Sequence, residues 1–142
     1  MKHKTLIQLR DADFVECLRS VAGRYEKDRR TVSPEIIIAE AIASRPRRYY
    51  LSFTTVHNTL SRLRSAGTLS VAPLSGSVNS RCQWIDINRA VSRYLALHKG
   101  ASLADAITYV VNFSRPDRFY ISDRKARELF RRTLRREYHY VG

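Results

Sequence analysis

The sequence has few cysteines and few glycines, and it has no long hydrophobic run. Two cysteines, Cys17 and Cys82, lie far apart in the 142 residues, which excludes a disulfide framework, a four-cysteine zinc site and an iron–sulfur cluster. The four histidines have no paired metal-ligand spacing, so we predict no metal and no cofactor. No stretch reaches the ~18 apolar residues of a membrane span, and the apolar start from Thr5 to Leu9 is too short for a secretory signal. We therefore expect a cytoplasmic protein.

Catalytic motifs are also missing. The sequence contains no GxGxxG, no P-loop, no GxSxG and no histidine with an arginine three residues later. Asp86 and Asp105 are the only acids between Glu40 and Asp117, and each is explained by a helix start. We therefore expect a protein that is not an enzyme.

The sequence has a large excess of positive charge. Lysine and arginine total 26 against 13 acids, a formal charge of +13, and the surplus is spread along the chain. A folded body with this charge attracts polyanions, and arginine donates two parallel hydrogen bonds to phosphate. Ribosome contact, an anionic membrane and solubility alone are the competing interpretations. We favour nucleic acid and expect no membrane partner.

Hydrophobic periodicity predicts a mainly α-helical protein with a small β-hairpin. Ser33-Pro34-Glu35 is a typical helix start. The alternating segments within residues 68–87 flank a polar run and predict the hairpin. Residues 3–9 are expected to be a short strand or an extended lead-in. The other helices are expected at about 12–25, 34–45, 52–66 and 86–99, after Ser102 and after Ser122.

One sequence element occurs twice, seventy positions apart. Residues 44–52 read SRPRRYYLS and residues 114–122 read SRPDRFYIS, with six of nine positions identical. Both copies follow an apolar helix and lead into a serine-capped helix, which favours duplication or convergent use of one helix–loop–helix device. Arg48 and Arg118 of these copies are candidate phosphate contacts, although the element also suits a purely structural role.

The helix predicted at residues 52–66 has the features of a base-reading helix. Its predicted inner face is Val56, Leu60 and Leu63. Its candidate DNA-contacting residues are Ser52, Thr54, Thr55, His57, Asn58, Ser61 and Arg62. Threonine and asparagine can read base edges, and arginine can bind guanine or phosphate.

The segment from Phe53 to Leu69, FTTVHNTLSRLRSAGTL, resembles the recognition helix of ferric-uptake-regulator-type winged helices. The likeness covers residues 33–87 and implies that Thr55, His57 and Asn58 face DNA. Because His57 and Asn58 replace the family's tyrosine and arginine, the likeness implies no base preference. The family's CxxC pairs and histidine-rich sensor have no counterpart, so it implies no metal sensing.

The remaining candidates lie in the predicted wing and in the last helix. Arg81 stands beside the predicted wing tip, where one arginine suits a minor-groove contact. Arg124, Arg127 and Arg131 belong to a basic last helix, which is either a second nucleic-acid contact or a solvated surface.

These features predict a winged helix-turn-helix followed by a helical C-terminal unit. We expect a winged-helix-like domain at residues 1–87 and a helical unit at 88–142, which contains the second copy of the repeated element. The alternative is that both parts pack as one domain. The function expected is sequence-reading double-stranded DNA binding, by a small transcriptional regulator or a mobile-element accessory protein, with a homodimer possible. An RNA- or ribosome-associated protein and a protein–protein adaptor are the alternatives.

Overall fold

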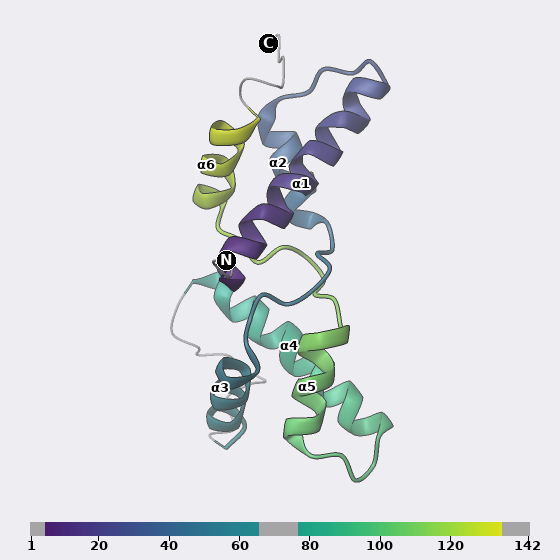
Figure 1. Ribbon diagram of the computed structural model, residues 1–142, viewed down its shortest axis with the longest axis vertical. Coiled ribbons are helices and arrows are strands. Elements are labelled where there is room, and N and C mark those ends of the chain that lie inside the picture. The colour runs from purple at the N-terminus through teal and green to yellow at the C-terminus, as the bar shows by residue number, and fades with distance from the viewer. Residues whose placement is uncertain (1–4, 66–76, 135–142) are drawn as a thin grey trace, which may run out of the picture. The chain divides into compact units, whose positions relative to one another are not determined.

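Helices are the only regular secondary structure that the computed structural model shows in its described residues, 5–65 and 77–134 (Figure 1). These residues form six helices: α1 (Leu6–Lys27), α2 (Pro34–Ala43), α3 (Phe53–Ser65), α4 (Val78–Leu97), α5 (Leu103–Phe113) and α6 (Asp123–Thr133). None of the helices in this part of the chain is long and apolar enough to cross a membrane.

Short polar residues at the helix starts explain where several helices begin. The hydroxyls of Ser77, Ser102 and Ser122 each accept the backbone N–H three residues later. Thr5 forms a capping box with Gln8, so α1 begins earlier than the predicted residue 12. Residues 6–9 of the segment that was predicted to be extended are therefore helical, and residues 3 and 4 lie outside the described part of the chain.

The predicted β-hairpin over residues 68–87 is wrong, and the winged helix-turn-helix fold is wrong with it. The second predicted strand, residues 82–87, lies inside α4, and residues 68–76 lie outside the described part of the chain. The polar run that suggested a turn contains Ser77, which caps α4, and the run continues into the first turn of that helix. Alternation over so few residues does not separate a strand from a helix, and Ile87 and Val91, one helical turn apart, are fully buried.

The chain divides into two compact units, and the first, unit 1, contains α1, α2 and α6. Its buried apolar side chains include Phe14, Leu18, Val21, Ile37, Ala41, Ala126 and Phe130. The Phe119 ring packs edge-on against Phe14 with centroids 5.2 Å apart, and the Phe119 N–H donates to the carbonyl of Ile42 at 2.9 Å. Tyr25 on α1 donates a hydrogen bond to Glu40 on α2, which raises the pKa of the Tyr25 phenol.

The second, unit 2, contains α3, α4 and α5. Its core cluster includes Tyr49, Val56, Leu60, Ile87, Val91, Ile107 and Val110. Asp86 is the one charged residue buried in the described part of the chain, and its Oδ1 accepts a hydrogen bond from the Tyr49 hydroxyl at 2.7 Å.

The boundaries between the units fall at the same point in both copies of the repeated element. The chain passes from unit 1 to unit 2 between Pro46 and Arg47, and it returns between Pro116 and Asp117. Each repeat consists of two helices, the element and a third helix. The third helices are exchanged: α3 packs against α5, and α6 packs against α1 and α2. This division differs from the predicted domain boundary between residues 87 and 88.

Candidate nucleic-acid interface

Helix α3 is fixed in unit 2 by one apolar face and one arginine. The predicted inner face is buried, with Val56 and Leu60 fully enclosed and Leu63 8% exposed. Arg64 donates from Nε to Asn88 Oδ1 at 3.1 Å and from Nη2 to the Ser92 hydroxyl at 2.8 Å, both on α4. Because Arg64 is committed to these bonds, it anchors the helix and does not belong to its exposed side.

The opposite side of α3 is open. Thr54, Thr55, Asn58 and Arg62 are exposed, and we call these four residues the α3 flank. Positions 54, 58 and 62 are four residues apart, so they lie along one side of the helix. The flank therefore presents a hydroxyl, an amide and a guanidinium in a row, which are the groups that read base edges and phosphates.

Three other predicted α3 residues are less available than the α3 flank. The exposed Ser52 uses its hydroxyl to cap the helix, accepting the Thr55 N–H at 3.2 Å and donating to the Thr55 hydroxyl at 3.0 Å. His57 is half-buried and stacks on Phe53 with ring centroids 5.4 Å apart. Ser61 is half-buried as well.

Helix α6 in unit 1 carries a separate positive surface. Its exposed residues Arg124, Arg127 and Arg131, which we call the arginine row, are spaced so that they share one side of the helix. None of the three forms an ion pair with a described residue. The other cations of α6 are paired. Lys125 lies 3.7 Å from Asp11 and 3.9 Å from Glu128, and Arg132 lies 3.2 Å from Glu128.

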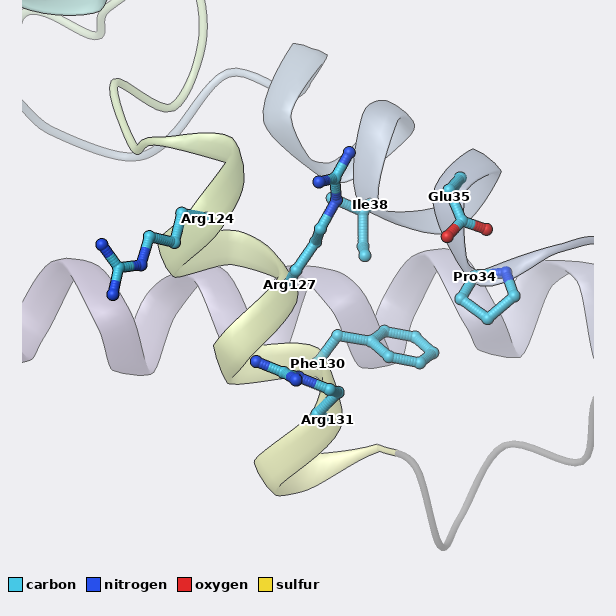
Figure 2. Close-up of a pocket in the computed structure, with 7 residues that line it drawn as sticks. All are labelled: Pro34, Glu35, Ile38, Arg124, Arg127, Phe130 and Arg131. Atoms are coloured by element: carbon cyan, nitrogen blue, oxygen red, sulfur yellow. The ribbon is translucent and has the colours of Figure 1, made fainter.

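The arginine row borders a pocket between α6 and α2 (Figure 2). The pocket has a volume of about 490 Å³. Besides the arginine row, its lining consists of Pro34, Glu35, Ile38 and Phe130. Guanidinium groups thus stand beside an apolar floor, with one carboxylate on the α2 side.

The two third helices differ in chemistry on the same face. With the seventy-residue offset of the repeat, Arg124 corresponds to Thr54, Arg127 to His57 and Arg131 to Ser61. One copy therefore carries hydroxyl and imidazole groups where the other carries guanidinium groups.

The other predicted contacts take different positions. Arg81 lies in α4 and is half-buried, so its predicted place beside a wing tip is wrong. Arg48 Nε donates to the Tyr49 carbonyl at 3.0 Å, and Arg118 Nε donates to the Phe119 carbonyl at 3.5 Å. The same hydrogen bond thus occurs in both copies of the repeated element, which supports a structural role for these arginines.

Sequence reasoning missed a ladder of four rings in unit 2. Tyr94 stacks on His98 with centroids 4.1 Å apart and on Tyr109 with centroids 4.8 Å apart, and Tyr109 contacts Phe113 at 5.4 Å. Tyr109 is 44% exposed and Phe113 is 73% exposed. The available signal was the i,i+4 spacing of Tyr94 and the C-cap residue His98 at the end of α4, and of Tyr109 and Phe113 on α5.

Comparison with known proteins gives no match to any protein family, curated protein or solved structure. The resemblance of residues 53–69 to a recognition helix stays a prediction that rests on those residues alone. In the described part of the chain, no three His, Cys, Asp or Glu side chains are placed to hold a metal ion.

Proposed function

We propose that this protein binds double-stranded DNA, with the α3 flank reading base edges and the arginine row contacting phosphates. The observation that carries the proposal is a helix anchored on one face and open on the other, in a chain of charge +13. The finer proposal is a small transcriptional regulator or a mobile-element accessory protein.

The division of chemistry between the two helices supports this proposal. A major groove accepts one helix, and specificity comes from side chains that match the donors and acceptors of the base edges. Asn58 offers one donor group and one acceptor group, as adenine recognition requires. Phosphate contacts add affinity without sequence preference. This suits the guanidinium groups of the arginine row, which form no ion pair with a described residue.

The first test is sequence selection from a random duplex library with the full chain and its Asn58→Ala variant. Loss of a bidentate base contact removes about 1–3 kcal/mol of discrimination, so one position of the selected site should become degenerate. Asn112→Ala is the matched control, because Asn112 is exposed on α5 and bonds only the Thr108 carbonyl among the described residues, at 2.7 Å. An unchanged site in Asn58→Ala, or an equal change in the control, would refute base reading by α3.

Fluorescence anisotropy against salt tests the phosphate contacts. Contact with ~5–8 phosphates gives a log K against log salt slope of about −5 to −7. Arg131→Ala should weaken binding to all sequences alike and reduce the slope by about one. Weak association that does not change with salt would contradict the proposal.

RNA binding is the second candidate, and the exposed ring ladder of unit 2 favours it. Exposed aromatic rings bind unpaired bases by stacking on them. The bases of duplex DNA are already paired and stacked on one another, so they are not open to such contacts. Competition between a selected duplex and a structured RNA separates the two functions. Displacement of the duplex by equimolar RNA would assign the protein to RNA instead.

A further inference from the structure

The pocket between α2 and α6 in unit 1 has a lining that suits a particular kind of ligand. We propose that it binds one nucleotide unit, with the phosphate on the arginine row and the base against Ile38 and Phe130. This inference goes beyond duplex recognition by α3 and does not depend on it, because the pocket lies within unit 1 and α3 belongs to unit 2.

The α6 wall of the pocket is built for an anion. Three exposed guanidinium groups line it without an ion-pair partner among the described residues. Arginine binds phosphate through parallel hydrogen bonds in a planar fork. The neighbouring cations on the same helix, Lys125 and Arg132, form ion pairs with Asp11 and Glu128, whereas the arginine row forms none with a described residue.

The rest of the pocket suits a planar ligand group that carries hydrogen-bond donors. Figure 2 shows Arg124 at one end of the pocket and Pro34 with Glu35 at the other, with the Phe130 ring between them. Ile38 and Phe130 give an apolar surface, and the Glu35 carboxylate can accept hydrogen bonds from N–H groups. A ligand with an anion at one end and N–H donors at the other matches this order.

A nucleotide has this polarity, since its phosphate and the amino group of its base lie at opposite ends. A volume of about 490 Å³ falls in the range of roughly 300–1,000 Å³ that is typical of organic ligand sites, and inorganic phosphate would leave most of it empty. A fatty acid would satisfy the guanidinium groups and the apolar floor but would offer no donor to Glu35. The nucleotide can be a free metabolite or one residue of a polynucleotide, because the contacting groups are the same.

Calorimetric titration of the full chain tests the proposal with four probes: AMP, a short single-stranded oligoadenylate, phosphotyrosine and inorganic phosphate. AMP or the oligoadenylate should bind at least about tenfold more tightly than inorganic phosphate, because one stacked base adds that much. Binding of AMP identifies a free nucleotide as the source. Binding of the oligoadenylate alone identifies a residue of a nucleic acid strand.

Two variants of α6 provide the matched comparison. Arg131→Ala should weaken nucleotide binding about tenfold, whereas Arg132→Ala, which removes the same charge from the next position, should leave it nearly unchanged. An equal loss in both variants would show a general charge effect and overturn the proposal. Equal binding of nucleotide and inorganic phosphate, tighter binding of phosphotyrosine, or no binding of either nucleotide probe would also overturn it. The arginine row takes part in both proposals, so Arg131→Ala alone does not separate them. AMP binding is measured without duplex DNA and base reading is tested through Asn58, so the two proposals can fail separately.

Discussion

At the scale of single residues, the two repeats differ most informatively where one has a tyrosine and the other a phenylalanine. Both rings, Tyr49 and Phe119, are buried at the same place in the repeated element. The Tyr49 hydroxyl donates to the buried Asp86, whereas Phe119 packs edge-on against Phe14. A hydroxyl is therefore present in the copy whose core contains a buried carboxylate, which needs a donor because burial removes its contact with water.

The change Tyr49→Phe keeps the ring and removes this donor. We expect the free energy of unfolding to fall by about 1–3 kcal/mol, because a buried carboxylate oxygen loses a hydrogen bond. Urea unfolding followed by circular dichroism measures the change. Tyr109→Phe is the control, since Tyr109 is 44% exposed and its change should stay within about 0.5 kcal/mol. Equal stabilities of the two variants would contradict the proposed role of the Tyr49 hydroxyl.

At the scale of helices, local chemistry predicted starts and buried faces better than it predicted the type of every element. Val56, Leu60 and Leu63 are buried as their spacing indicated. The sequence at the start of α4 resembles a turn, because serine and asparagine favour turns and helix caps for the same reason, namely side-chain bonds to nearby backbone. The pocket lining could not be predicted, because Glu35 and Arg131 come from helices that are far apart in the sequence.

The serine caps give a prediction about helix stability. Ser122 accepts the Lys125 N–H at 3.1 Å, so Ser122→Ala should cost about 1 kcal/mol of unfolding free energy. Ser33 occupies the same position before α2, but its side chain makes no capping hydrogen bond. Ser33→Ala should therefore cost only a few tenths of a kcal/mol. Thermal unfolding of both variants measures these losses. A larger loss of stability in Ser33→Ala than in Ser122→Ala would contradict the proposed role of the Ser122 cap.

At the scale of the whole chain, the exchange of third helices is the feature that sequence periodicity could not indicate. A helix with one apolar face can pack on either of two equivalent helix pairs, and hydrophobic spacing alone does not choose between them. The repeated element does contain a hint. A proline disfavours helical conformation in the preceding residue, so Pro46 and Pro116 favour an extended segment between the second and third helices. The repeated element was visible in the sequence, but the partner of each third helix was not.

The exchange predicts which part of the protein depends on α6. Truncation after Ile121 removes α6, which packs against α1 and α2 in unit 1. Amide hydrogen exchange should then lose protection over residues 6–43, while residues 78–113 keep theirs, although the latter segment is closer in sequence to the deletion. Truncation after Leu134 keeps α6 and serves as the control. Protection lost over α4 and α5 instead would mean that each third helix packs within its own repeat. The result would then favour two sequential domains, and the pocket between α2 and α6 would not exist.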